Sequence, residues 1–185
     1  MLQRNRSVQP LNGFRMKLAF ANAINSDAAD LAALHTAVSD ALTRRFGEGF
    51  WSSSPSERAI LNDLRKPKFR RILIARSDGH RIIAALRLAT KKPWAIDTAY
   101  FTKVMRPLYL TGMAVHPEFQ RQGIGRLLLN EAEAVARAWP ADAIRLDAFD
   151  AAAGAGAFYA KCGFREVARV TYKNDPLIYF EIILR

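Results

Sequence analysis

The stretch from Leu108 to Arg126 constrains the fold more than any other part of the chain. It begins with an apolar run, residues 108–115, which has the length and composition of a buried strand. Pro117 ends the strand, because proline has no backbone N–H to donate to a neighbouring strand. Gly123 and Gly125 follow, and behind them apolar residues recur every three or four positions, as in a helix that ends at Pro140. The order is therefore buried strand, glycine loop and amphipathic helix.

This arrangement predicts a site for an anion. The first turn of a helix has unpaired N–H groups and the positive end of the helix dipole, which together favour a phosphate or pyrophosphate. The glycines let the backbone approach the ligand without a Cβ, and Arg121 and Arg126 add positive charge. Two other phosphate loops are excluded. Leu128 stands where a dinucleotide-binding fold has its third glycine, and no Gly-Lys-Ser/Thr follows the loop.

The full pattern is more specific than a pair of glycines. Gln120, Gly123 and Gly125 form Gln-x-x-Gly-x-Gly, which resembles the signature of the GNAT N-acetyltransferases, enzymes that use acetyl-coenzyme A. A second segment, residues 158–164, is similar to the family's Leu-Tyr-x-x-x-Gly-Phe. The two matches have the family's order and spacing. They cover roughly residues 108–165 and, more loosely, the chain after Met16.

The remaining elements follow from periodicity and from turn and cap residues. We expect strands at 16–23, 71–76, 81–88, 143–149, 164–172 and 177–184, and helices at 28–45, 54–64, 124–139 and 151–162. A turn at 77–80 joins two of the strands. Interleaved strands and helices indicate an α/β layer structure. Residues 16–185 are predicted to form one domain, and residues 1–15, which are polar and basic, a loose N-terminal arm.

The resemblance sharpens the fold and assigns the cofactor. It implies a single-domain GNAT-like fold with a mixed, mostly antiparallel central sheet flanked by helices. The two central strands beside the loop splay apart and admit the pantetheine arm of acetyl-CoA. The backbone of 113–115 pairs with that arm, and an N–H near Val115 polarises the thioester carbonyl. The residues assigned to acetyl-CoA are Met113, Ala114, Val115, Gln120, Arg121, Gln122, Gly123, Ile124, Gly125 and Arg126.

The resemblance also assigns Tyr159 as the catalytic acid that protonates the departing thiolate. A tyrosine has a reference pKa of about 10 and is protonated at neutral pH, so it can serve as an acid. The alternative is an aromatic residue that closes the core. Cys162 is expected to be a buried packing residue, because its own motif contains no basic partner. Ala152 replaces an asparagine with which many relatives hold the cofactor.

The acceptor site is less clear. Periodicity disappears from 89 to 107, and irregular segments of this length are usually functional or mobile. Asp97 is the obvious partner for an ammonium group, and we expect Trp94 and Tyr109 to contact the acceptor as well. The alternative is a surface excursion whose aromatic residues complete the core. Tyr109 occupies the position of an acidic base in many relatives, so the sequence identifies no base.

Composition limits the possible partners. The net charge of +11 would attract polyanions, but the basic residues are spread along the chain, so we do not expect nucleic acid to bind. The three histidines lack neighbours at ligand spacing, which predicts no metal site. A single cysteine favours a cytoplasmic protein, and the lack of an apolar run of about 20 residues predicts no membrane-spanning segment and no membrane partner. We expect a monomer or a homodimer.

These observations predict an acetyl-CoA-dependent N-acetyltransferase. It would move the acetyl group to a primary amine, on a small molecule or a protein, by direct attack in a ternary complex. The alternative is a non-catalytic acyl-CoA-binding or sensing module, which would release no free thiol in the presence of an amine. A nucleic-acid-binding protein is a third class, whose binding would collapse with salt.

Overall fold

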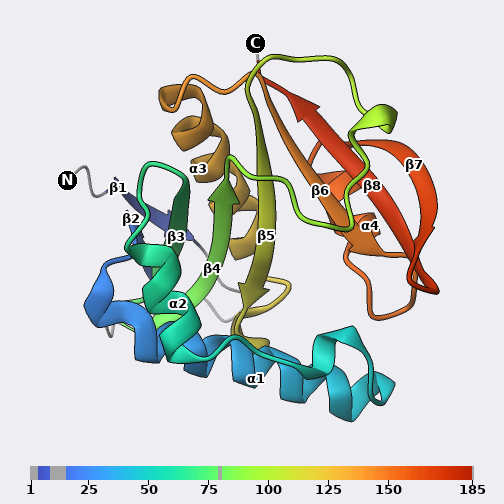
Figure 1. The fold of residues 1–185 in the computed structure, drawn as a ribbon. Coiled ribbons are helices and arrows are strands. Elements are labelled where there is room, and N and C mark those ends of the chain that lie inside the picture. The colour runs from blue at the N-terminus through green and yellow to red at the C-terminus, as the bar shows by residue number, and fades with distance from the viewer. Residues whose placement is uncertain (1–3, 9–15, 79–80, 185) are drawn as a thin grey trace. The chain divides into compact units, whose positions relative to one another are not determined.

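A computed structural model describes residues 4–8, 16–78 and 81–184 (Figure 1). Its eight-stranded sheet has the order β1-β2-β3-β4-β5-β6-β8-β7. The strands are β1 Arg4–Val8, β2 Met16–Asn22, β3 Arg70–Arg76, β4 Ile82–Ala89, β5 Pro107–Val115, β6 Ala143–Phe149, β7 Arg165–Tyr172 and β8 Asp175–Ile183. The pairs β1–β2, β2–β3, β6–β8 and β7–β8 are antiparallel, and β5–β6 is parallel. The mixed, mostly antiparallel sheet is therefore confirmed.

Four α-helices accompany the sheet in the described residues: α1 Ala28–Phe46, α2 Glu57–Leu64, α3 Ile124–Ala138 and α4 Gly156–Lys161. Short 3-10 helices are η1 Asn25–Asp27, η2 Phe50–Ser52, η3 Thr98–Tyr100 and η4 Pro117–Phe119. Local sequence explains the ends of α2 and α4. The Ser56 hydroxyl accepts a hydrogen bond from the Ala59 N–H and caps α2, and Gly163, just beyond α4, has the positive φ expected there.

Most predicted elements are confirmed to within two or three residues. One correction concerns the expected loose arm, because Arg4–Val8 pairs with β2 along its whole length and is therefore ordered as a strand. The predicted turn at 77–80 lies partly outside the described residues, which omit positions 79 and 80. The predicted helix at 151–162 is shorter than expected, since α4 begins only at Gly156.

The chain divides into two compact units by its contacts. Unit 1 contains residues 1–87 and 112–131, and unit 2 contains residues 88–111 and 132–185. In unit 1, apolar side chains of α1 and α2 pack against β3, β4 and β5. The buried members of this core are Ala28, Leu31, Leu34, Ile60, Ile72, Ile74, Ile82, Ala85 and Ala114. The periodic apolar face predicted for the first helix is the face that is buried.

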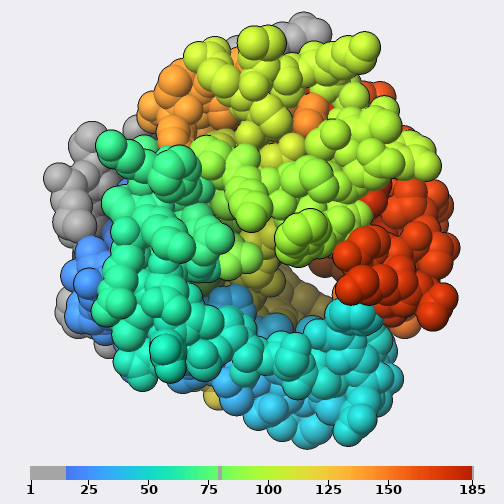
Figure 2. Space-filling view, in the orientation of Figure 1, coloured from blue at the N-terminus to red at the C-terminus, as the bar shows by residue number. Residues whose placement is uncertain are grey.

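Unit 2 has its own aromatic core, made by Ile96, Phe101, Tyr109, Leu177 and Tyr179. The irregular segment before β5 is held to β8 by a buried carboxylate. The Thr102 hydroxyl donates to Glu181 Oε1 at 2.6 Å, and Arg165 also pairs with Glu181, whose side chain is 0% exposed. The segment is therefore ordered although it contains no strand. Figure 2 shows it in yellow-green at the surface of the molecule.

Strand β5 contains a local irregularity. Gly112, in its middle, has a φ of +60°, which favours glycine over residues with a side chain. The parallel ladder between β5 and β6 runs from Pro107–Ala143 to Tyr109–Arg145, although β5 has nine residues.

Candidate functional site

The loop between β5 and α3 has the geometry of an anion site. Arg121 and Gly123 have φ values of +62° and +79°, which turn the chain sharply before α3 begins at Ile124. The Leu127 N–H donates to the Gly123 carbonyl at 3.1 Å, so the N–H groups of the three residues between them come before the first N–H that donates within the helix. A Cβ placed on Gly123 would meet no heavy atom within 4 Å. The side of the loop where that Cβ would point is therefore open.

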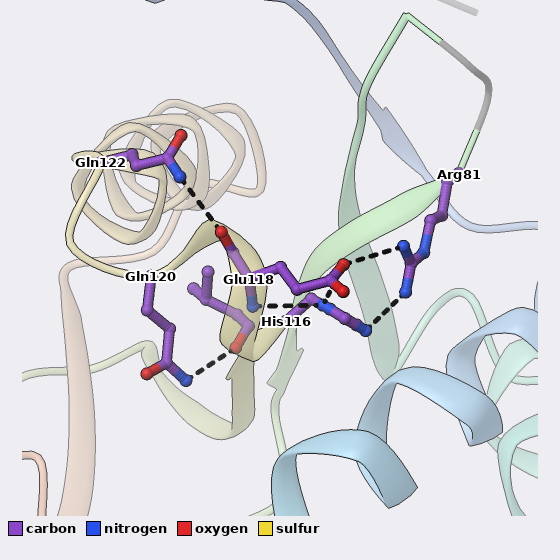
Figure 3. Close-up of polar contacts among 6 residues, drawn as sticks. Arg81, His116, Glu118, Gln120 and Gln122 are labelled. Carbon is purple, nitrogen blue, oxygen red and sulfur yellow. Dashed lines mark hydrogen bonds and ion pairs between the residues drawn. The ribbon is translucent and has the colours of Figure 1, made fainter. Parts of the chain in front are cut away.

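Two glutamine side chains brace this loop from within (Figure 3). The Gln120 amide donates to the Val115 carbonyl at 3.0 Å, and the Gln122 amide donates to the Glu118 carbonyl at 3.2 Å. Both contacts join the loop to the end of β5 or to η4. The two side chains thus hold the shape of the loop in this structure, while the exposed Arg121 and Arg126 supply its positive charge.

A cluster that the sequence did not reveal supports the same loop (Figure 3). Arg81 Nη2 lies 2.5 Å from His116 Nε2, and Arg81 Nη1 lies 3.2 Å from Glu118 Oε2. Burial and then the Arg81 charge lower the pKa of His116. At neutral pH the imidazole is therefore uncharged. Its Nδ1 accepts a hydrogen bond from the Glu118 N–H at 3.4 Å and lies 3.6 Å from the Glu118 carboxylate.

The backbone of 113–115 points in a defined direction. The His116 N–H donates to the Ile83 carbonyl of β4 at 2.8 Å. Peptide groups alternate along a strand, so those of Met113 and Val115 face the side opposite β4. The bond from the Gln120 amide to the Val115 carbonyl lies on that side and agrees with this direction.

Tyr159 lies on α4 in unit 2 and is 6% exposed. Its ring contacts the rings of Phe158, Phe164 and Phe180. Burial, and then the nearby Asp147 carboxyl and Cys162 thiol, raise the pKa of Tyr159 well above its ordinary value. The phenol is therefore protonated at every physiological pH. Cys162 is half-buried, not fully buried as the sequence led us to expect.

The residues predicted for the acceptor lie in unit 2. Trp94 is 84% exposed, and the Lys91 ammonium lies 5.9 Å from the centre of its ring. The Asp97 carboxylate accepts from the Ala99 N–H at 3.0 Å and caps η3. Trp94 and Asp97 both line a cavity of about 390 Å³, together with Tyr100, Tyr172 and Tyr179. Tyr109, in contrast, is 4% exposed and belongs to the core of unit 2, which argues against contact with an acceptor.

A second cavity, of about 310 Å³, lies in unit 1 and was not predicted. Its polar lining includes His35 of α1, Asp63 of α2 and Arg87 of β4, and Gly112 of β5 completes it. His35 carried a weak signal in the sequence. It follows Leu31 by four residues and so falls near the apolar face of its helix, where a histidine is unusual.

Comparison with known proteins identifies the family. The model of the Acetyltransferase (GNAT) family matches residues 35–164, so the chain belongs to this family. It is similar to the GNAT domain of S. lividans PAT, with a TM-score of 0.71 and 17% identity over 98% of this chain and 97% of that one.

It is also similar to PaiA N-acetyltransferase from Thermoplasma acidophilum in complex with coenzyme A, with a TM-score of 0.66 and 17% identity over 88% and 97% of the two chains. The ribosomal-protein-S18-alanine N-acetyltransferase from Escherichia coli has a TM-score of 0.65 and 16% identity over 90% and 94%. No match was found among curated proteins.

The chain is thus a GNAT acetyltransferase, a class that uses acetyl-CoA. Among the described residues, no group of three or more His, Cys, Asp or Glu side chains is placed to hold a metal ion. No helix in the part of the chain that the structure describes has the length and apolar character needed to span a membrane.

Proposed function

We propose that this protein transfers the acetyl group of acetyl-CoA to a primary amine by direct attack in a ternary complex. The observation that carries the proposal is the loop of 120–126, where positive φ values at Arg121 and Gly123 lead into the N-terminus of α3. A helix N-terminus approached through an open glycine is suited to a pyrophosphate.

The residues of unit 1 fit the cofactor in two ways. First, the N–H groups of the first turn of α3, with Arg121 and Arg126, would hold the phosphates, and Gln120 and Gln122 would keep the loop in shape. Second, the peptide groups of Met113 and Val115 face away from β4, where they would pair with the pantetheine arm. An N–H in this run would donate to the thioester oxygen, which gains negative charge during attack. Bound acetyl-CoA supplies the activated acyl group, and the protein supplies this preorganised backbone.

Tyr159 would be the acid that assists the departing sulfur. Its raised pKa makes the phenol a weaker acid than an ordinary tyrosine and a much weaker one than a thiol, whose pKa is about 8.5. Full transfer of its proton to a free thiolate is therefore uphill, and Tyr159 would act by donating a hydrogen bond to the sulfur as charge develops there.

The cavity around Trp94 and Asp97 is one place where an amine could bind. A carboxylate beside aromatic faces attracts an ammonium group through charge and through cation–π contact. We retain Trp94 and Asp97 as proposed acceptor contacts on this ground. We regard Tyr109 as a packing residue in the core of unit 2.

The test of the cofactor site uses Gly123→Val, because a branched side chain there would fill the space left for a phosphate. We expect this variant to lose the rise in Tm that coenzyme A gives the wild type. It will also melt lower without ligand, since a non-glycine residue at positive φ costs about 1–3 kcal/mol.

Gly47→Val is the matched control. Gly47 also has a φ of +79°, and a Cβ added there would meet no atom within 4 Å, but it follows α1 and lies outside the loop. This variant should keep the response to coenzyme A despite its lower Tm. Equal coenzyme A affinity in wild type and Gly123→Val would refute the loop as the phosphate site. A second measurement separates an acetyltransferase from a binding module. An acetyltransferase releases free thiol from acetyl-CoA when an amine is present, and a binding module does not.

A further inference from the structure

The cavity of unit 1 has apolar walls and a small polar end. Its apolar side chains include Leu31, Ile60, Ile72 and Leu86, which come from α1, α2, β3 and β4. A volume of about 310 Å³ suits a small molecule. An occupant must therefore bring an apolar body as well as polar groups.

The polar end belongs to a charged cluster with an excess of positive charge. Asp63, whose side chain is 12% exposed, forms ion pairs with both Arg70 and Arg87. One carboxylate between two guanidinium groups leaves this three-residue cluster with a net charge of +1, although Arg70 itself does not line the cavity. Asp63 is the only carboxylate among the described residues that line the cavity, and Arg87 lines it as well. Since a partly buried positive charge attracts an anion, this end of the cavity favours an acidic group on the occupant.

His35 lies where the cavity meets β5. A Cβ built on Gly112 would lie 3.7 Å from His35 Cε1, so the imidazole contacts the strand beside Met113. Three elements face it: β4 with Arg87, α2 with Asp63 and β5 with Gly112. Burial first, and the Arg87 charge second, lower the pKa of His35. At neutral pH the ring is therefore uncharged and able to accept a proton.

We propose that this cavity binds a small primary amine that also carries an acidic group and an apolar body, and that His35 accepts the proton that the amine loses. The inference rests on the proposed function. It also supplies the base that the sequence did not identify, from a helix far from the cofactor loop in the chain.

Atoms and charge balance in this reaction. The amine nitrogen forms a bond to the acetyl carbon, and the bond from that carbon to sulfur breaks. The proton on nitrogen passes to an imidazole nitrogen of His35, which later releases it to water. The sulfur leaves as a thiolate and takes up one proton, so the products are an N-acetyl compound and coenzyme A.

The experiment measures thiol release from acetyl-CoA with matched pairs of amines. Each pair consists of an apolar amino acid and its carboxamide, so that the two differ only in the acidic group. A polyamine, which carries extra positive charge in place of an acid, is tested beside them. We expect the wild type to prefer the acid by about 10–100-fold in kcat/KM, the range of a charged hydrogen bond. In Arg87→Gln the ratio between acid and carboxamide should fall to about 1.

Arg44→Gln is the control for this variant. Arg44 is exposed on α1 and does not line the cavity, so its loss changes the net charge equally but should leave the preference unchanged. His35→Gln should lower kcat by about 10²–10⁴-fold with acetyl-CoA affinity retained. It should also reduce the fall in kcat/KM that we expect for the wild type on acidification, when His35 becomes protonated, and leave the part of the fall that comes from protonation of the amine itself.

Each outcome has a definite meaning. Equal or better turnover of the carboxamides or the polyamine overturns the proposed acceptor class, although the acetyltransferase proposal stands. A His35→Gln enzyme with the wild-type rate and pH profile overturns the role of His35. Binding of acetyl-CoA without thiol release for any amine defeats the proposed function itself, and the inference with it.

Discussion

The two cavities have similar sizes and different walls. The cavity of unit 1, about 310 Å³, has aliphatic walls, a neutral histidine and a carboxylate, Asp63, that pairs with two arginines, of which Arg87 lines the cavity. The cavity of unit 2, about 390 Å³, has a carboxylate, Asp97, and an ammonium group, Lys92, among the aromatic rings of Trp94, Tyr100 and Tyr179. The first surrounds its charges with aliphatic side chains, and the second with aromatic faces that can also contact a cation.

The comparison shows that net charge does not reveal acceptor preference. The chain carries a formal charge of +11, yet one cavity combines a carboxylate with aromatic faces. Acceptor choice depends on the few charges that are partly removed from water, because interactions between exposed charges are screened by salt. Variants in the two cavities can therefore separate their roles. Tyr159→Phe, which should disable the reaction itself, gives the effect against which they are compared.

The largest effect that we expect comes from Tyr159→Phe, which tests the reaction without regard to the cavity that holds the acceptor. The change removes a hydroxyl and keeps the ring in contact with Phe158, Phe164 and Phe180. We expect kcat to fall by about 10²–10⁴-fold, with acetyl-CoA affinity retained and a modest change in Tm.

Tyr159→Leu provides the contrast, because it removes the ring as well and should lower the Tm further. Wild-type turnover by Tyr159→Phe would show that water protonates the thiolate and that the residue serves packing. Loss of acetyl-CoA binding would make Tyr159 a binding residue.

A smaller effect is expected from the cavity of unit 2. Asp97→Asn removes the charge but keeps an oxygen that can cap η3, whereas Asp97→Ala removes both. We expect both Asp97 variants and Trp94→Ala to raise the acceptor KM a few-fold and to leave acetyl-CoA affinity unchanged. A few-fold change corresponds to the free energy of a cation–π contact at an exposed site. If KM rises in Asp97→Ala but not in Asp97→Asn, the Asp97 side chain acts by capping η3 and its charge does not bind the acceptor. A larger rise in KM here than in Arg87→Gln would move the acceptor from unit 1 to unit 2.

The smallest effect concerns stability against pH. Because the pKa of His35 in the folded protein lies below its ordinary value of 6.5, the unfolded chain binds this proton first as the pH falls. The free energy of unfolding should therefore decrease as the pH drops through about 6.5, and His35→Gln should flatten that decrease. His116 has a pKa lowered in the same direction and should leave a residual slope. Thermal unfolding between pH 8 and pH 5 measures both slopes, and equal slopes would mean that His35 is not buried as described.

Several features of the fold could be read directly from the sequence. The strand of 143–149 was placed with both ends correct, and α1 was placed within one residue, because apolar periodicity and cap residues act over a few positions. The glycine loop was identified for the same reason, since Gly123 must reach a positive φ before α3 can begin. The strand at Arg4–Val8 was missed because its polar sequence gains order only from its pairing with β2.

The acceptor cavity depended on tertiary structure. His35, Asp63 and Arg87 each resemble an ordinary surface or core residue in the sequence, and dozens of positions separate them. Only the packing of α1 and α2 on the strands of unit 1 brings them to one cavity. The sequence by itself determined the local elements and the phosphate loop, because backbone preference and periodicity are short-range. The pKa of His35 and the excess charge beside it were decided by the fold, because burial and charge pairing arise only when distant segments exclude water together.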